Sequence, residues 1–206
     1  KDYPTAMKDP WEFSHGNKIP KREANPIVSK CYAYDAGTEQ FFVKDEKHPY
    51  VQEKPFDWIR GYQVGGKSLI WARQTQRWSQ YEFDAPKRDG YAVEWPISYQ
   101  DLAPFYTQVE KFVGISGNYD GIPSLPDGHF LKPWELNCVE KHVQSRVKEF
   151  YKGNRHVIIG RCAHLTSPEP QHIEQGRGQC QARNLCYRGC PYGAYFSSNS
   201  STLPSA

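Results

Sequence analysis

The sequence predicts a mixed fold, either α/β or α+β, that is rich in loops. Two segments carry apolar residues at spacings of three and four, which is the pattern of an amphipathic helix. Several short segments rich in β-branched and aromatic residues favour strands. The chain of 206 residues also contains 16 prolines and 16 glycines, which indicates many turns and long irregular connections between these elements.

The composition excludes two broad classes of protein. A net charge of +3 with 24% charged residues lacks the electrostatic footprint of a nucleic-acid-binding protein, so no nucleic-acid partner is expected. No apolar run approaches the roughly 20 residues needed to cross a bilayer, so we do not expect a transmembrane protein. A chain of this length can bury a sizeable core, and its aromatic content of 15% suits a packed globular protein.

Residues 1–55 read as a long irregular excursion with little hydrophobic periodicity. Short strands are expected within it at 27–34 and 40–43. An excursion of this length is usually functional or is stabilised by a larger body. The remaining residues, 56–206, form the second part of the predicted organisation. Six prolines interrupt regular structure in residues 1–55, namely Pro4, Pro10, Pro20, Pro26, Pro49 and Pro55.

A pair of glycines follows a strand-prone segment at 56–59. Gly65 and Gly66 have no Cβ atoms, so their backbone can pass close to a flat or an anionic group. Ser68 and the amide groups around it are able to donate hydrogen bonds to a phosphate or to the edge of a heterocycle. Most turns of this kind are ordinary turns, so the motif by itself leaves a binding role and a purely structural role open.

The first predicted helix begins after Ser98. Asp101 lies three residues further on and gives a near capping box, and Gly114 is suited to the position just past the helix end. The apolar residues between them follow a helical spacing and are expected to lie in the core. They are Leu102, Phe105, Tyr106, Val109, Phe112 and Val113.

The second predicted helix runs from about Leu136 to Lys152, with Asn137 as its N-cap and Gly153 after its end. The segment 156–162 that follows is rich in β-branched residues and reads as a strand. The helix carries apolar side chains along one face, namely Val139, Val143, Val147, Phe150 and Tyr151.

Three cysteines near the C-terminus form the sharpest chemical signal. Cys180, Cys186 and Cys190 are spaced Cys-x5-Cys-x3-Cys and are followed by Pro191. An iron–sulfur cluster uses cysteine thiolates, and a Cys-x3-Cys-Pro ending also closes the bacterial ferredoxin motif. Because three thiolates suit a cluster of three irons, we favour this interpretation. Cys162 is a weaker candidate for the surroundings of the cluster.

Three other interpretations of the cysteine segment stay open. A disulfide framework needs an even local number of cysteines and a secreted context. Structural zinc prefers four ligands, and no fourth ligand stands at a suitable spacing. The thiols are also able to remain unligated. Cationic neighbours favour thiolates, and the segment contains three, namely Arg177, Arg183 and Arg188.

Together, the two motifs make the chain resemble the glucose–methanol–choline (GMC) family of flavoprotein oxidoreductases, over most of residues 40–206. The stretch Val64-Gly-Gly-Lys-Ser-Leu-Ile-Trp71 resembles the Gly-Gly-x-Ser motif by which that family contacts flavin, in the form found in its pyranose-oxidase-like branch. The stretch Gly189-Cys-Pro-Tyr-Gly-Ala194 resembles a second segment of that branch. In the multi-subunit bacterial sugar dehydrogenases of the family, a matching cysteine spacing binds a 3Fe–4S cluster.

The resemblance implies a role for each matching residue. Cys180, Cys186 and Cys190 would ligate the cluster. Ile70 takes the position of the histidine that anchors flavin covalently in some pyranose oxidases, so the FAD is expected to be non-covalent there. The cofactor-binding set would comprise Gly65, Gly66 and Ser68 along the pyrophosphate and ribityl chain of FAD, and Trp71 and Ala72 beside the isoalloxazine ring.

The resemblance also implies what this chain leaves to other parts of the protein. The Gly-x-Gly-x-x-Gly turn that seats the ADP half of FAD does not occur in the sequence, and the His–His or His–Asn catalytic pair of the family is missing too. We therefore expect an internal fragment of a GMC-type FAD-binding fold that lacks the first βαβ unit, carries no catalytic residue and is inactive alone. Residues 56–206 would be its flavin-covering and cysteine-cluster part.

The intact enzyme implied by the resemblance oxidises a hydroxyl group of a sugar or glycoside. Its electrons would pass from FAD through the iron–sulfur cluster to an acceptor. The expected partners are the substrate, the remaining parts of the same FAD protein, a small subunit and a cytochrome acceptor. The location would be the periplasm, reached with a partner subunit, or the cytoplasm. The alternative is a non-enzymatic iron–sulfur or zinc-binding module whose whole function resides in the three cysteines.

Overall fold

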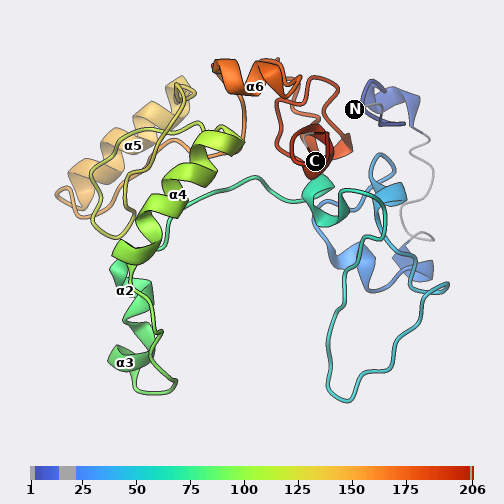
Figure 1. Ribbon diagram of the computed structural model, residues 1–206, viewed down its shortest axis with the longest axis horizontal. Helices are drawn as coiled ribbons and strands as arrows, with labels where there is room; N and C mark the ends of the chain where they lie inside the picture. The colour runs from blue at the N-terminus through green and yellow to red at the C-terminus, as the bar shows by residue number, and fades with distance from the viewer. Residues whose placement is uncertain (1–2, 14–21, 205) are drawn as a thin grey trace. The chain divides into compact units, whose positions relative to one another are not determined.

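The computed structural model describes residues 3–13, 22–204 and 206, and these divide into two compact units (Figure 1). The first unit contains the described residues of Lys1–Ala72 together with Gln175–Arg177 and Gln181–Ala206. The second unit contains Arg73–Glu174 and Gly178–Cys180. The described structure is mixed and rich in loops, as predicted, and is compatible with a fragment of an α/β fold.

Short 3-10 helices provide the regular structure of the first unit. The strands predicted at 27–34 and 40–43 are wrong, because each segment forms a 3-10 turn instead. Asp45 Oδ2 accepts hydrogen bonds from the backbone N–H groups of Ile27 and Val28 at 2.9 and 3.2 Å, which favours a turn over a strand ladder. The helices are η1 (Pro10–Glu12), η2 (Val28–Lys30), η3 (Glu39–Phe41), η4 (Gly66–Leu69), η5 (Cys186–Arg188) and η6 (Ser198–Ser200).

An apolar cluster holds the first unit together. Tyr3 and Ile59 pack at its edge, and Tyr3 meets Phe41 edge to face with ring centroids 6.3 Å apart. The irregular first 55 residues therefore bury apolar side chains against the residues that follow the Gly-Gly pair. The buried members of the cluster are Val28, Ala33, Phe41, Phe42, Leu69 and Ile70.

The two predicted helices of the second unit are confirmed as α4 (Tyr99–Val113) and α5 (Cys138–Phe150). Ser98 and Asp101 form a reciprocal capping box, in which the backbone N–H of Ser98 donates to Asp101 Oδ2 at 2.8 Å. Asn137 caps α5 with the same arrangement. The other helices of this unit are α2 (Gln80–Phe83), α3 (Ala85–Asp89) and α6 (Pro170–Glu174). Among the described helices, none combines the length and the apolar character that a membrane crossing requires.

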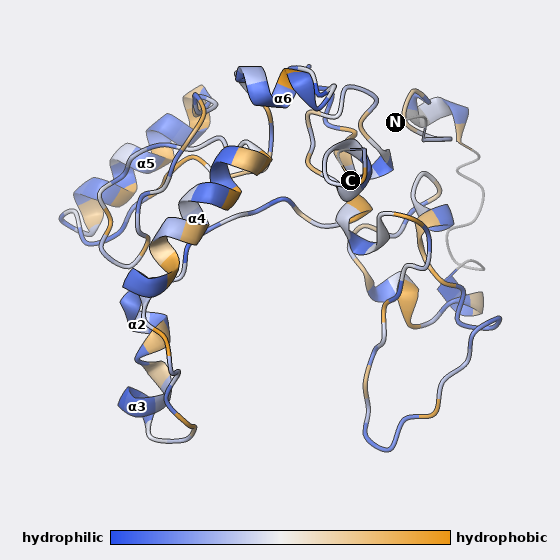
Figure 2. Ribbon diagram, in the orientation of Figure 1, coloured by the Kyte–Doolittle hydropathy of each residue, from blue (hydrophilic) through white to orange (hydrophobic). Residues whose placement is uncertain are grey.

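The apolar faces of α4 and α5 are largely exposed, so the expectation that the α4 stripe lies in the core is wrong. Figure 2 shows hydrophobic and hydrophilic residues alternating along both helices. Phe105 is 60% exposed, and Val113 is the apolar residue of α4 that is buried. Phe150 on α5 is 78% exposed. The physical reason is that α4 turns Glu110 inward, where a buried arginine pairs with it.

The strand predicted at 156–162 is also wrong. Cys162 makes single antiparallel bridges to Gln74 and to Ser116, and the described β-structure consists of isolated bridges of this kind. The ladders stop after one residue because left-handed backbone bends both neighbouring segments, at Arg73 (φ 58°) and at Gly114 (φ 77°).

Buried ion pairs take the place of a large apolar core in the second unit. Arg77 donates to Glu110 through two parallel hydrogen bonds of 2.8 and 2.6 Å, and both side chains are buried. Glu110 also accepts the backbone N–H of His129 at 2.7 Å. The hydrogen bond to Glu110 raises the pKa of Arg77, so this arginine stays charged at any accessible pH. Such a bidentate pair fixes the orientation of both partners.

Replacing Arg77 by methionine should destabilise the second unit, because Glu110 would be left buried without its counter-charge. We expect the Arg77→Met substitution to lower the free energy of unfolding by about 3–5 kcal/mol in urea denaturation. Arg146→Met is the matched control, since it breaks an exposed pair with Glu149 on α5 and should cost less than about 1 kcal/mol. Equal losses in the two variants would contradict the structural role assigned to Arg77.

Candidate functional site

The Gly-Gly motif forms a tight loop that leads into η4. Gly65 and Gly66 both have left-handed backbone, with φ of 97° and 48°. The Ser68 hydroxyl donates to the carbonyl oxygen of Gly65 at 2.5 Å, and the Ser68 backbone N–H contacts the same oxygen at 3.1 Å. The predicted site residue Ser68 thus stabilises the tight turn of this loop through two hydrogen bonds to Gly65.

A second segment, residues 195–199, binds directly to this loop. The backbone N–H of Ser198 donates to Ser68 Oγ at 3.1 Å, and the Tyr195 hydroxyl lies 3.1 Å from the carbonyl oxygens of both Ser68 and Trp71. We call this set of hydrogen bonds the serine clasp. In Figure 1 the loop appears in teal beside the red C-terminal segment. The clasp joins the two sequence motifs, which lie more than 100 residues apart in the chain.

The two glycines differ in what surrounds them. A Cβ atom on Gly65 would overlap the side-chain oxygen of Asn199, whose amide nitrogen donates to the Val64 carbonyl oxygen at 3.1 Å. A Cβ atom on Gly66 would meet no heavy atom within 4 Å. Gly65 is therefore required by the clasp, whereas the backbone at Gly66 is open to an approaching group.

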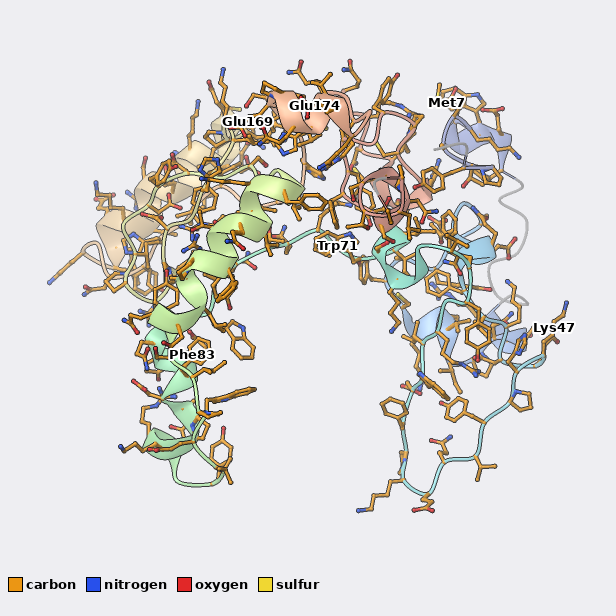
Figure 3. All side chains as sticks on the ribbon, in the orientation of Figure 1. Met7, Lys47, Trp71, Phe83, Glu169 and Glu174 are labelled. Carbon is orange, nitrogen blue, oxygen red and sulfur yellow. The ribbon has the colours of Figure 1, made fainter. Side chains whose placement is uncertain are left out.

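Trp71 follows the loop and is labelled in Figure 3. Its indole N–H donates to the carbonyl oxygen of Phe196 at 3.0 Å, and the two rings meet edge to face at 6.4 Å. Ile70 before it is buried in the apolar cluster, and Ala72 after it is exposed. The aliphatic side chain of Ile70 offers no nucleophile for a covalent cofactor bond.

The structure places the three predicted cysteine ligands in different units. Cys186 opens η5, and Cys190 begins a turn closed by the Gly193 N–H, which donates to the Cys190 carbonyl oxygen at 3.1 Å. Both lie in the first unit, whereas Cys180 belongs to the second unit, where its N–H donates to the Leu165 carbonyl oxygen at 2.8 Å. Within the residues that the structure describes, no three His, Cys, Asp or Glu side chains converge as metal ligands would.

The N-terminal segment covers a part of the first unit that we call the cysteine loop, namely residues 175–177 and 181–193. The Thr5 hydroxyl lies 3.0 Å from the carbonyl oxygen of Arg188, and Arg183 donates to the carbonyl oxygen of Ala6 at 2.7 Å. Tyr3 packs closely on Gly189. A Cβ atom added to Gly189 would overlap the side chain of Tyr3. The sequence carries no signal for this cover, because its contacts join residues about 180 positions apart.

Arg177 is the buried cation of the cysteine loop, with only 1% of its surface exposed. Its Nε–H donates to the Gly193 carbonyl oxygen at 2.9 Å, and its guanidinium lies 5.4 Å from the centre of the Phe196 ring. Burial lowers the pKa of Arg177 to about 10, while the charge of Cys190 acts in the opposite direction. Arg177 is therefore charged at neutral pH and lies within electrostatic reach of a predicted ligand.

The second unit contains a further pair of half-buried titratable groups that the sequence did not connect. Burial and the charge of Arg73 lower the pKa of His164 to about 4, and burial raises the pKa of the Cys162 thiol. Gln74 Nε2 lies 3.4 Å from Cys162 Sγ. Both side chains are therefore neutral at pH 7.

Part of the chain is similar to known dehydrogenases. Over 137 residues it is 26% identical to the fructose dehydrogenase large subunit of Gluconobacter japonicus, a match that covers 65% of this chain and 24% of that protein. Over 124 residues it is 38% identical to the 2-methyl-1,2-propanediol dehydrogenase of Mycolicibacterium austroafricanum, covering 57% of this chain and 21% of that protein. The chain thus spans about a quarter or less of the length of these relatives. No protein-family model matches it.

The different surroundings of the two glycines lead to a prediction about stability. Gly66→Ala should lower the free energy of unfolding by about 1 kcal/mol, because alanine is strained at positive φ. Gly65→Ala should cost clearly more, because the new methyl group also displaces Asn199 and opens the clasp. Urea denaturation of the two variants measures the difference. Equal costs would show that the clasp does not constrain Gly65.

Proposed function

We propose that this chain is part of a GMC-family oxidoreductase that uses FAD to oxidise a hydroxyl group of a sugar or glycoside and passes the electrons through an iron–sulfur cluster. The observation that carries the proposal is the serine clasp. It holds the Gly-Gly loop against the segment that follows Cys190, and these two motifs belong to the same family pattern.

The names of the two relatives support the substrate class. Fructose and 2-methyl-1,2-propanediol both carry hydroxyl groups on neighbouring carbon atoms, and both relatives are named dehydrogenases. A polyhydroxylated substrate for the intact protein is consistent with both. One relative is named as the large subunit of its enzyme, which supports a further subunit as a partner; a cytochrome acceptor is part of the proposal through the family resemblance alone.

Two features of the Gly-Gly loop support the proposed flavin. The open space over Gly66 leaves its backbone accessible to a ring or a phosphate, and the exposed Ala72 leaves room beside Trp71. Because the Ser68 hydroxyl is engaged by Ser198, Ser68 would act on FAD by holding the shape of the loop. When bound, FAD would accept two electrons from the substrate, and the cluster would carry them one at a time.

The cysteine loop has the donor chemistry of an iron–sulfur site. Cys186 and Cys190 lie in one loop with the buried cation Arg177, and such a cation favours the thiolate form that binds iron. Cys180, six residues before Cys186, would complete the set. The nucleotide-binding turn and the catalytic base would come from the remaining parts of the protein.

Cofactor content of the purified full-length protein tests the proposal. We expect released FAD, about three iron atoms per chain, and a flavin absorption spectrum that bleaches when a sugar or polyol is added without oxygen. Iron without flavin would instead support a non-enzymatic electron-transfer module. Zinc without iron would support a structural zinc domain. Either result would overturn the proposed oxidoreductase.

The electron route leads to a kinetic prediction. Cys186→Ser should leave reduction of the flavin by substrate intact in stopped-flow measurements, because the flavin contacts lie in the Gly-Gly loop. It should abolish turnover with an external one-electron acceptor, because the cluster loses a ligand. Cys138→Ser is the control, since this exposed thiol lies on α5 in the second unit, and full turnover is expected. Turnover that survives in Cys186→Ser would show that electrons do not pass through the cysteine loop.

A further inference from the structure

Three aromatic rings meet beside a pocket in the second unit. The rings of Trp78, Phe83 and Trp95 lie edge to face in pairs, with centroids 6.0, 6.3 and 6.4 Å apart. Phe83, labelled in Figure 3, is buried, whereas Trp78 and Trp95 are 51% and 50% exposed. The buried phenyl ring thus holds two indole rings in place, and each tryptophan keeps about half of its surface open to a ligand.

The pocket, which we call the indole pocket, has a volume of about 340 Å³. Small-molecule sites usually measure about 300–1,000 Å³ and combine apolar walls with a few polar groups. Trp95 and Phe83 line this pocket directly, and all of its lining residues belong to the second unit. Its polar and charged lining residues are Gln80, Asp84, Lys87, Glu94, Ser98 and Asp101.

Gln80 fixes the polar side of the indole pocket. Its Oε1 accepts the backbone N–H of Tyr99 at 3.1 Å, and its Nε2 donates to Asp84 Oδ1 at 2.8 Å. Asp101 Oδ2 accepts from Ser98 in the cap of α4. In the hydrogen bonds of the described residues, Asp84 and Asp101 each use one carboxylate oxygen, so each keeps a second oxygen for a ligand.

The charges of the lining indicate the class of ligand. Three carboxylates and one ammonium group line the indole pocket, and that ammonium group, on Lys87, lies 3.2 Å from Glu94. The excess of carboxylates disfavours a phosphate or another anion. A neutral ligand with several hydroxyl groups is able to donate to the carboxylates and to accept from the ammonium group. A sugar ring also presents C–H groups on its faces, which pack well on an indole ring.

We propose that the indole pocket binds a neutral polyhydroxylated ligand, such as the ring of a sugar or glycoside. Trp95 lies against the C–H face of this ligand, and Asp84 accepts hydrogen bonds from its hydroxyl groups. The inference goes beyond the proposed function, because it concerns the second unit alone and requires neither FAD nor an iron–sulfur cluster.

Fluorine NMR of the full-length protein labelled with 5-fluorotryptophan measures binding at the pocket itself. Trp95→Phe and Trp11→Phe identify the two resonances by their absence. Titration with methyl β-D-glucopyranoside should shift the Trp95 resonance until it saturates, because the sugar ring packs on this indole. The Trp11 resonance is the internal control and should stay unchanged, since Trp11 is an exposed residue of the first unit.

A substitution of the proposed hydrogen-bond acceptor tests the polar side. Asp84→Asn should raise the dissociation constant read from the Trp95 resonance by roughly tenfold, because it removes a charged acceptor. Its amide oxygen is still able to accept from Gln80, so the fold is retained. Asp89→Asn is the matched control, because it neutralises an exposed carboxylate at the far end of α3, outside the lining. Equal weakening in the two variants would contradict a direct contact with Asp84.

Two other results would overturn the proposal. A Trp95 resonance that the glucoside leaves unchanged would show that the indole pocket binds no sugar ring. A shift with tetramethylammonium chloride and none with the glucoside would identify a site for cations. The outcome is distinct from that of the proposed function, since a full-length protein without flavin and iron would overturn the oxidoreductase while the Trp95 resonance still measures sugar binding.

Discussion

The hydrogen bonds of the Ser68 hydroxyl hold two distant segments of the first unit together. It donates to Gly65 and accepts from Ser198, so one oxygen atom ties a loop near residue 65 to the chain near residue 198. Tyr195 adds hydrogen bonds to the carbonyl oxygens of Ser68 and Trp71. Each such hydrogen bond contributes only about 1 kcal/mol, but a buried polar group that lost its partner would cost about 1–3 kcal/mol. The clasp therefore selects one arrangement of the two loops.

Within the first unit, the same clasp joins the Gly-Gly loop to the segment that follows Cys190. The open backbone at Gly66 lies in one of the two joined segments, and the turn at Cys190 directly precedes the other. Arg177 links the two sides, because it binds the Gly193 carbonyl oxygen and lies over Phe196, whose own carbonyl oxygen accepts the Trp71 indole N–H. The two loops are thus connected by hydrogen bonds and by the ring of Phe196.

The second unit follows a different physical principle, since buried charge pairs organise its interior. Arg77 pairs with Glu110, and Arg161 donates to Asp127 at 2.7 Å and to the Pro126 carbonyl oxygen at 2.6 Å. Charged groups of this kind are tolerated inside a protein when an opposite charge and hydrogen bonds offset the loss of water around them. Their presence explains why α4 turns a glutamate inward while Phe105 faces solvent.

The local signals in the sequence determined the two long helices. The capping boxes at Ser98 and Asn137 and the glycine at position 114 act within one turn of the chain, so they could be recognised without the fold. The sequence also brought the glycine pair and the cysteine segment forward as candidate site residues. The composition of residues 27–34 wrongly predicted a strand, because the carboxylate of Asp45 binds the backbone there and favours a turn.

Only the tertiary structure decided how the candidate site is assembled. The clasp and the N-terminal cover over the cysteine loop both depend on contacts between residues far apart in the chain. Three arginines looked equivalent in the sequence, yet burial and hydrogen bonding direct Arg177 alone among them at the Cys190 turn. Hydrophobic periodicity could not foresee which helix face would be buried, because that choice depends on the partners that packing supplies.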